Sequence, residues 1–524
     1  MNLTTSIYKP LLLTGAACCA AGCAQKAAAP KRYNIVYIMT DDHTQQMISC
    51  YNKRFAHTPN IDRIAENGVK FTSSFVANSI SGPSRACLMT GKHSHKNGKV
   101  NNDHHFDGTQ QTMPKLLQAA GYQTAMIGKW HLGGTPQGFD FWEILPGQGD
   151  YYQPDFITPK GRVRETGYVS DIITDKSINW LESRQEDKPF CLFVHHKGPH
   201  RNWMPKLSDL NAYEDSIFPF PETFFDDYSG RVAAQTAEMR IGSDHDMDLV
   251  NDNKVYTGTE TSRLSGMYNV KDSLGSYGRM SAAEKEQWNA FYGPIISDFK
   301  ARNLSGKELA EWKYQRYLKD YIKTAKAVDD NIGRLLDYLE KEGLMENTLI
   351  VYTSDQGFYM GEHGWFDKRF MYEESLRTPL VMQLPKDLKR RGDITEMVQN
   401  IDHAPTFLEI AGVQVPQDIQ GDSYLPYLMG EKPDHVRDAI YYHYQEYPAE
   451  HAVKRHYGIR TERYKLIHFY NDVDEWEFFD LQKDSLEMNN LINDPAYAQL
   501  IEEHKVKLKA LQEKYDDPIR FEYQ

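Results

Sequence analysis

The sequence predicts an α/β fold: a large, mainly parallel β-sheet sandwiched by helices, followed by a smaller C-terminal α+β subdomain. Two observations support this prediction. Several apolar runs are continuous rather than alternating, which is typical of strands covered on both faces. After about residue 421 the pattern changes to short strands joined by turns and a terminal helix.

Four apolar runs are the expected central strands, at residues 33–39, 124–127, 190–194 and 349–353. Each run is followed at once, or within a residue or two, by polar side chains that are able to do chemistry. Open α/β sheets bind ligands at the carboxyl ends of their strands. We therefore expect the four strand ends to contribute to one site.

Helical segments and an insertion are expected between and after these strands. Apolar spacing at residues 113–120 and 311–342 predicts two helices. The polar, irregular stretch at 201–307 is expected to be an insertion of loops and short helices that frames a substrate cleft. Beyond residue 421 the expected antiparallel strands and final helix lie at 457–467, 477–481 and 495–515.

The N-terminus predicts export. Lys9 precedes a short apolar run and a stretch of small residues, a pattern typical of a secretory signal and too short for a membrane span. Cys23, after Ala21 and Gly22, is the expected lipidated residue of a bacterial lipoprotein that is periplasmic or at the cell surface. Cys18 is a competing site, and an ordinary cleaved signal is the alternative. The expected segments are a signal at 1–23, a tether at 24–31, a catalytic domain at 32–420 and a C-terminal subdomain at 421–524.

Composition excludes some classes of function. The 524 residues are 40% hydrophobic and 25% charged, as in ordinary globular proteins. A net charge of −13 argues against nucleic-acid binding, and an anionic substrate would need a locally positive pocket. Outside the signal only Cys50, Cys87 and Cys191 remain; their spacing fits no zinc motif, and we expect buried thiols rather than a disulfide framework.

The most informative motif is SGPSRACLMTG at residues 81–91. Its local pattern predicts the start of a helix, with Pro83 in the first turn, Ser81 or Gly82 as the cap and Gly91 at the end. The N-terminus of a helix presents free N–H groups and the positive end of the helix dipole. Such an end suits an anionic ester.

Oxygen ligands follow two of the expected strands. Asp41 and Asp42 come after the first run, and Asp355 and Gln356 after the last. A single aspartate at a strand end more often caps a helix or holds a turn. Two such pairs together with the 81–91 motif favour a hard cation, Ca²⁺ above Mg²⁺, over zinc.

The 81–91 motif resembles that of the type I sulfatases, which have an alkaline phosphatase-like fold. The resemblance extends from about residue 31 to the end of the chain, with further similar stretches at 58–63, 401–406 and 420–423. It implies that a serine-type maturase oxidises Ser81 to formylglycine. The hydrated aldehyde offers two hydroxyls on one carbon, one to attack sulfur and one to expel sulfate.

The resemblance also implies roles for other residues. Arg85 and Lys129 would orient the hydrated aldehyde, and His131 would take the proton that lets sulfate leave. His200 and Lys368 would contact the sulfate, and one of them would protonate the leaving alcohol. The implied Ca²⁺ ligands are the group derived from Ser81 together with Asp41, Asp42, Asp355 and Gln356, the last in place of the commoner Asn or His.

Within the family the chain is most similar to bacterial N-acetylglucosamine-6-O-sulfatases that degrade host glycans, through HHKGPHRNW at 195–203 and RHYG at 455–458. The resemblance implies 6-O-desulfation of N-acetylglucosamine in heparan sulfate, keratan sulfate or mucin glycans. The acidic net charge favours a pocket for one terminal sugar over a long basic groove, so we expect exo action. The expected sugar contacts are Asp367, Arg369, His456 and, as a stacking surface, Trp203. A salt bridge within the loop is the alternative for Asp367 and Arg369.

Three other functions are weighed against this one. The chain could act on a sulfate at another sugar position. A phosphatase or phosphodiesterase of the same superfamily would hold two metals through a fuller Asp/His set, whereas this chain has one apparent cluster. A non-catalytic glycan-binding lipoprotein would have lost site residues, whereas every expected role is filled here.

Overall fold

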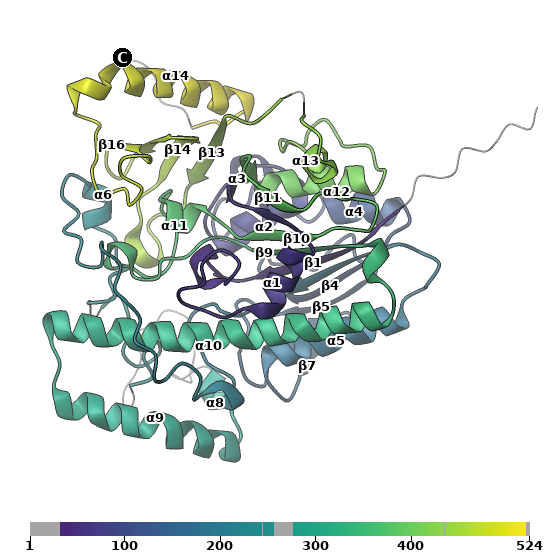
Figure 1. Cartoon of the computed structure of the whole chain (residues 1–524), viewed down its shortest axis with the longest axis horizontal. Coiled ribbons are helices and arrows are strands. Elements are labelled where there is room, and N and C mark those ends of the chain that lie inside the picture. The colour runs from purple at the N-terminus through teal and green to yellow at the C-terminus, as the bar shows by residue number, and fades with distance from the viewer. Residues whose placement is uncertain (1–31, 244, 256–275, 434, 520–524) are drawn as a thin grey trace, which may run out of the picture. The chain divides into compact units, whose positions relative to one another are not determined.

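The computed structural model describes residues 32–243, 245–255, 276–433 and 435–519, which belong to one compact unit (Figure 1). The expected signal, the lipid site at Cys23 and the tether lie outside the described residues. Within the described ranges, no helix combines the length and apolar character that a membrane span requires.

The centre of the fold is a ten-stranded sheet. Its five middle strands, in the order β9, β1, β8, β4 and β5, are mutually parallel, which confirms the predicted sheet. Antiparallel pairings occur only where β10 joins its neighbours and at the β5–β6–β7 edge. The strands in spatial order are β11 Gly392–Ile394, β2 Gly68–Phe71, β10 Leu380–Gln383, β9 Thr348–Ser354, β1 Asn34–Thr40, β8 Phe190–His195, β4 Gln123–Lys129, β5 Phe141–Leu145, β6 Asp155–Thr158 and β7 Gly161–Arg164.

Helices cover both faces of this sheet, which explains the continuous apolar runs. Along β1, Ile35 and Tyr37 face one core, and Val36 and Ile38 face the other. The first face is covered by α2 Ser81–Thr90, α4 Met113–Ala119, α12 His403–Ile410 and α13 Leu425–Met429. The second is covered by α1 Pro59–Glu66, α5 Val169–Ser183 and α10 Gly306–Lys341 (Figure 1).

The C-terminal part contains the predicted small antiparallel sheet. Its strands in order are β13 Ala439–Tyr444, β14 His456–Thr461, β15 Tyr464–Phe469 and β16 Glu475–Asp480. One face packs on the final helix, α14 Ala498–Lys514, through residues such as Tyr441. The opposite face, which includes Tyr442, packs on the loop that holds Phe370. The small sheet thereby lies directly behind a loop rich in predicted site residues.

The region at 201–307 differs from its prediction. It contains a 21-residue helix, α9 Ala282–Arg302, in addition to loops and short helices. A capping box formed by Ser281 and Glu284 starts this helix. Only Trp288 and Tyr292 of α9 are buried, so no continuous apolar stripe marked the helix in the sequence.

The remaining elements are short. They are β3 Ser74–Phe75, β12 Val398–Gln399, α3 Ser94–Asn97, α6 Val232–Gln235, α8 Ser276–Arg279 and α11 Glu373–Leu376, with 3₁₀ helices η1 Gln45–Met47, η2 Leu207–Asp209, η3 Met345–Asn347, η4 Glu362–Gly364, η5 Asn400–Asp402, η6 Glu450–Ala452 and η7 Pro495–Tyr497. Cys87 and Cys191 are buried free thiols and Cys50 is a partly buried one, as predicted.

Candidate active site

The predicted oxygen ligands meet at the carboxyl ends of β1 and β9. These strands pair in parallel, with Thr40 opposite Ser354, so the residues that follow them are neighbours. The backbone N–H of Asp355 donates to the Thr40 carbonyl at 3.1 Å. The N–H of Asp42 donates to Asp355 Oδ1 at 3.2 Å. The register of two parallel strands therefore brings together carboxylates more than 300 residues apart in sequence.

Ser81 is the first residue of α2, and its hydroxyl donates to Asp41 Oδ1 at 3.0 Å. The predicted helix start is confirmed, but the N-cap is Ile80 rather than Ser81 or Gly82. Ser81 is thus the first helical residue, and its hydroxyl binds Asp41 instead of capping the backbone N–H groups of the helix. Gly91 ends the helix with a left-handed φ of 66°, as predicted.

Arg85 lies one turn after Ser81 and links three strand ends. Its Nε and Nη2 donate to Asp355 Oδ2 at 3.2 and 3.0 Å, after β9. Its Nη1 donates to the Lys129 carbonyl at 2.9 Å and lies 3.1 Å from His195 Nδ1, at the ends of β4 and β8. The Arg85 side chain is completely buried, so these contacts fix the guanidinium in one orientation.

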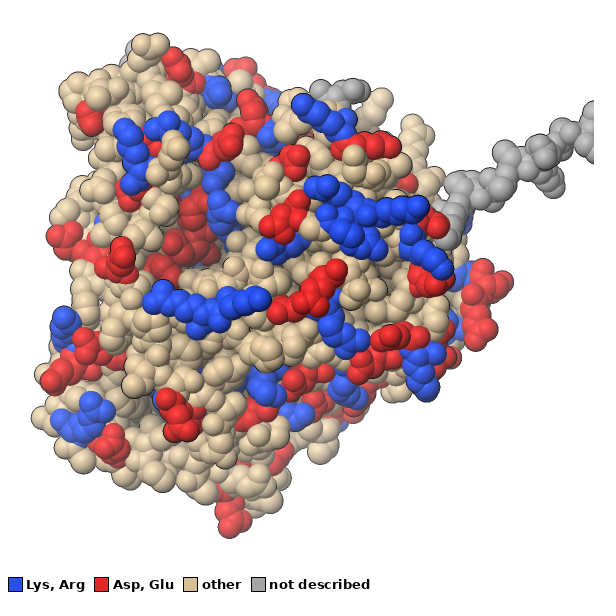
Figure 2. Space-filling view, in the orientation of Figure 1, with Lys and Arg blue, Asp and Glu red and all other residues tan. Residues whose placement is uncertain are grey.

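Two lysines balance the aspartates. Lys129 donates to Asp41 Oδ2 and to Gln148 Oε1, and Lys368 donates to Asp42 Oδ2 at 2.8 Å. The Lys129 side chain is fully buried and that of Lys368 is 6% exposed. The chain thus builds a local group of cations although its net charge is negative. Figure 2 shows that Lys and Arg are interspersed with Asp and Glu on the face it displays.

Burial dominates the electrostatics of the aspartates. It raises the pKa of Asp42 to about 7 and that of Asp355 to about 6, against the opposing effect of the neighbouring cations. Asp41 differs: burial raises its pKa, but Lys129, His200 and Arg85 together hold it well below its usual range. Asp41 is therefore the most firmly ionised of the three carboxylates.

The donor set fits a hard dication. Asp41, Asp42 and Asp355 supply carboxylate oxygens, and Gln356 donates through Nε2 to Asp42 Oδ1 at 2.5 Å. The amide oxygen of Gln356 is buried and has no hydrogen-bond partner in the described structure. An orphaned buried oxygen beside three carboxylates is the ligand chemistry that suits Ca²⁺ or Mg²⁺. His200 Nε2 lies 3.8 Å from Asp42 Oδ2 at the edge of this group.

The two predicted catalytic histidines follow strands and are held neutral. His131 comes after β4 with a φ of 53°, and its buried Nδ1 has no hydrogen-bond partner among the described residues. His200 Nδ1 interacts with the Arg201 carbonyl at 2.6 Å, which leaves Nε2 directed at the aspartates. Burial holds the pKa of both histidines well below its usual range. Neutral imidazoles with a free nitrogen suit proton transfer.

Asp367 and Arg369, on either side of Lys368, form an ion pair with each other, which is the alternative that the sequence left open for them. The structure adds His451, whose Nε2 lies 3.4 Å from Asp367 Oδ2. Asp367, Arg369 and His451 all have positive φ, at 77°, 99° and 70°, which is uncommon for residues other than glycine. Two loops, one with Asp367 and Arg369 and one with His451, are therefore held in strained conformations next to the site.

Two of the predicted sugar contacts, Trp203 and His456, are completely buried in this structure. Trp203 is completely buried and packs against Tyr317, Phe358 and Phe366, so it has no exposed face on which a sugar could stack. His456 is also completely buried.

Both ring nitrogens of His456 are already used. Its Nε2 accepts from the Met371 N–H at 3.1 Å and its Nδ1 donates to the Lys454 carbonyl at 2.8 Å. Burial lowers the pKa of His456 to about 3, consistent with a neutral ring. Through its bond to Met371, His456 holds the loop at residues 367–372 against the small sheet.

Sequence reasoning missed several neighbours of the site. His195 is the last residue of β8 and Lys197 follows two residues later, so the rule that strand ends hold function would have found them. Burial lowers the pKa of Lys197 to about 8, and its ammonium lies 4.6 Å from the Tyr151 ring centroid. Gln148 and His451 had no such signal, because irregular loops bring them to the site.

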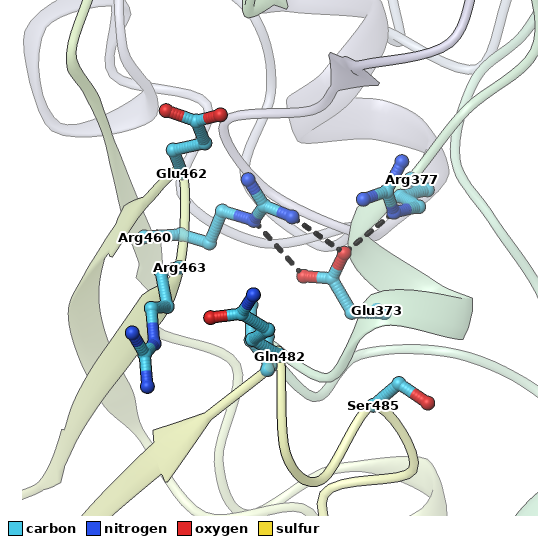
Figure 3. A pocket seen from close by; sticks show the side chains of 8 residues that line it. Glu373, Arg377, Arg460, Glu462, Arg463, Gln482 and Ser485 are labelled. Carbon is cyan, nitrogen blue, oxygen red and sulfur yellow. Dashed lines mark hydrogen bonds and ion pairs between the residues drawn. The ribbon is translucent and has the colours of Figure 1, made fainter.

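An open space of about 610 Å³ lies away from Ser81, between α11 and the small sheet (Figure 3). Its arginines are already paired: Arg377 Nε donates to Glu373 at 2.5 Å, Arg460 Nη2 donates to Glu373 at 3.1 Å, and Arg463 binds Asp480 at 2.7 Å. None of the residues that surround Ser81 lines this space. The chemistry of the predicted site therefore belongs to the strand ends.

Comparison with known proteins agrees with this geometry. Residues 33–413 match the sulfatase family, and residues 361–514 match the C-terminal region of N-sulphoglucosamine sulphohydrolase. An N-acetylglucosamine-6-O-sulfatase of Bacteroides thetaiotaomicron is 51% identical over 99% of this chain and 93% of its own. The solved structure of BT4656 with its substrate D-glucosamine-2-N,6-O-disulfate superposes with a TM-score of 0.89 at 51% identity, over 94% of this chain and all of that one. An N-acetylglucosamine-6-sulfatase of Capra hircus is 25% identical over 81% of this chain and 68% of its own.

Proposed function

Because the chain belongs to the sulfatase family, we propose that it removes the 6-O-sulfate of N-acetylglucosamine from host glycans, acting at the end of the glycan chain. The observation that supports this most is that Ser81, the aspartates and the cations converge at one sheet edge in a chain so similar to a named 6-O-sulfatase. Heparan sulfate, keratan sulfate and mucin glycans are the proposed sources.

Calcium is the proposed metal. Asp41, Asp42, Asp355 and Gln356 would hold it with the group derived from Ser81. When bound, the ion supplies positive charge that stabilises the charge developing on the sulfate oxygens.

Formylglycine at position 81, made by a serine-type maturase, would supply the nucleophilic hydroxyl and a second hydroxyl to expel sulfate. In the unmodified chain the Ser81 hydroxyl is already directed at Asp41, at 3.0 Å. This orientation supports the view that position 81 presents its oxygen to the metal ligands.

The surrounding side chains would orient charge and move protons. Arg85 and Lys129 fix the reacting oxygen, since both are fully buried and held by Asp355 and Asp41. Lys368 lies between Asp42 and Asp367, at 2.8 and 3.8 Å, which keeps it charged and suits it to hold the sulfate.

Proton transfer is assigned to the two histidines. His200, in the protonated form that the nearby anionic sulfate favours, would donate the Nε2 proton to the leaving alcohol, while His131 would accept the proton that accompanies sulfate release. Lys368 remains the alternative acid for the alcohol. The unpartnered Nδ1 of His131 and the exposed edge of His200, whose side chain is 13% exposed, support these roles.

The sugar is proposed to bind beside Lys368, through Asp367 and Arg369. A buried charged wall lies behind them: Arg201 Nη1 donates to Glu450 at 2.9 Å, and His451 contacts both Glu450 and Asp367. A wall of this kind would close the site around one terminal sugar rather than leave a groove for a polymer, which supports exo action. Export as a lipid-anchored bacterial protein is part of the same proposal.

The test is sulfate release from 6-O-sulfated N-acetylglucosamine by protein with Ser81 converted, beside a Ser81→Ala control. Release that is lost in the control supports the proposal. No release, with conversion shown by mass, would sink the 6-O assignment and direct the assay to 2-O-, 3-O- and 4-O-sulfated sugars. Cleavage of internal 6-sulfates in a polymer blocked at its non-reducing end would contradict exo action.

A further inference from the structure

A second group of metal-ligand side chains lies where α3 meets the C-terminal part, and it shares no residue with the Ser81 site. His95 comes from α3, His443 from β13, and Asp517 from the segment after α14. Their ligand atoms all lie within 4.8 Å of one another. The three side chains are 2%, 2% and 0% exposed.

The two histidine rings are oriented as metal ligands usually are. Both Nδ1 atoms face Asp517 Oδ2, at 3.2 Å for His95 and 2.6 Å for His443. The opposite nitrogens face oxygens: His95 Nε2 lies 2.9 Å from the Tyr515 carbonyl and His443 Nε2 lies 2.7 Å from Tyr470 Oη. Ligating histidines generally donate their second N–H to such an oxygen, which fixes the tautomer and ring orientation.

The tautomer of His95 creates a conflict that a cation would resolve. The Tyr515 carbonyl can only accept, so Nε2 carries the proton and the neutral ring presents a lone pair at Nδ1. That lone pair faces the Asp517 carboxylate at 3.2 Å, and His95 Nδ1 has no hydrogen bond in the described structure. Burial lowers the pKa of His95, which disfavours a proton as the bridging cation.

A third histidine indicates that the cluster is not optimised for hydrogen bonding alone. His93 is 1% exposed, and neither of its ring nitrogens has a hydrogen-bond partner among the described residues. Its ring stacks on that of His95, with centroids 5.6 Å apart, and lies 4.4 Å from the Tyr515 ring. Buried polar groups without partners are rare and costly in native structures, so this one needs an explanation.

We propose that His95, His443 and Asp517 form a second metal site, for a borderline transition-metal dication such as Zn²⁺. Two nitrogens and one carboxylate oxygen suit zinc, whereas the all-oxygen set at Ser81 suits calcium. Tetrahedral ligands at about 2.0–2.1 Å from zinc lie roughly 3.3 Å apart. The His95–Asp517 separation of 3.2 Å already matches this spacing, and the His443–Asp517 pair would open by less than an ångström.

The site would fasten the end of the chain to the catalytic part. Asp517 follows α14, His443 is in the small sheet, and His95 is in α3, shortly after the helix that carries Ser81. A metal that binds only the folded chain stabilises it. Zinc should therefore raise the melting temperature of the calcium-saturated protein.

The experiment uses full-length, tag-free protein in excess Ca²⁺, titrated with Zn²⁺ by calorimetry and with Co²⁺ by visible absorption. We expect one zinc equivalent, a cobalt spectrum of nitrogen and oxygen ligation, and a higher melting temperature. Asp517→Asn and His95→Gln should each weaken binding at least tenfold. The matched control is His468→Gln, which alters a histidine of the same sheet whose Nε2 lies 2.9 Å from Asp474 Oδ1.

Wild-type protein that takes up no zinc in the presence of calcium would overturn the proposal. Equal zinc affinity in wild type and in both variants would overturn it too, because the metal would then be bound elsewhere. Circular dichroism shows whether each variant is folded. If Asp517→Asn unfolds the chain, the zinc affinity of His95→Gln decides the question. A weakened affinity supports the proposal and an unchanged one overturns it.

Discussion

Replacing Arg85 by lysine tests whether a fork of donors, rather than a positive charge, organises the Ser81 site. Arg85 uses three nitrogens: Nε and Nη2 bind Asp355 at 3.2 and 3.0 Å, and Nη1 binds the Lys129 carbonyl at 2.9 Å. A lysine keeps the charge but has one nitrogen at the end of a flexible stem. It cannot serve the carboxylate and the carbonyl together.

The magnitude follows from the contacts that are lost. One buried acceptor is left without a donor, which costs about 1–3 kcal/mol, and the paired geometry on Asp355 is lost as well. We expect Arg85→Lys to lower the free energy of unfolding by about 2–4 kcal/mol. Loss of one fixed donor at a reacting centre typically lowers kcat by about 10²–10³, and we expect a loss of that order in kcat/KM.

The assay is sulfate release from 6-O-sulfated N-acetylglucosamine, scaled to the fraction of position 81 converted, because Arg85 lies inside the 81–91 motif through which we propose that Ser81 is modified. Unfolding in denaturant gives the stability. The control is Arg437→Lys, since Arg437 also forms a buried fork on Asp402, at 2.6 and 2.7 Å, and lies away from Ser81 in sequence and contacts. It should lose stability but keep its kcat/KM. Arg85→Lys with activity within about threefold of wild type, at equal conversion, would refute the reasoning.

Three further outcomes are expected. Gln356→Leu removes the orphaned amide oxygen, so calcium should raise the melting temperature only at about 10–100-fold higher concentration; an unchanged calcium titration contradicts this. Burial raises the pKa of Glu477 from 4.5 to about 8, so the folded chain binds a proton that the unfolded chain releases, and stability falls as pH rises from about 4.5 to 8. Glu477→Gln should therefore be more stable than wild type at pH 8, by up to about 4 kcal/mol in the free energy of unfolding. Near pH 4 the variant and wild type should be equally stable. His456→Ala should lower stability with KM unchanged, whereas Asp367→Asn should raise KM; the reverse pattern would restore His456 as a sugar contact.

The strands and their functional ends were predictable because two independent signals coincide there. A strand covered on both faces leaves a continuous apolar run, and a site at its carboxyl end leaves polar residues immediately after it. Asp41 and Asp355 satisfy both conditions, as do Lys129 and His200 within a few residues. Local sequence was therefore sufficient for these positions.

The errors come from contacts that local sequence does not encode. Trp203 and His456 have the residue types of sugar contacts, but their exposure depends on segments that lie far away in sequence. These are α10 for Trp203 and the loop at 367–372 for His456. His451 reaches Asp367 only because a strained loop between β13 and β14 turns toward the site. Helix α9 was missed for a related reason, since only two of its side chains are buried.

The charges of the site explain why metal and substrate should bind together. Four carboxylates and four fixed cations surround Ser81; they are Asp41, Asp42, Asp355, Asp367, Arg85, Lys129, Lys368 and Arg369. With the carboxylates ionised these charges cancel, so a bound dication would leave an excess of positive charge in a buried space, which an anionic ester offsets. Linkage is reciprocal: calcium should tighten binding of sulfate, and sulfate should tighten binding of calcium by the same factor. Calorimetric titrations of each in the presence of the other measure this factor, and a factor of one would show that the buried cations alone attract the ester.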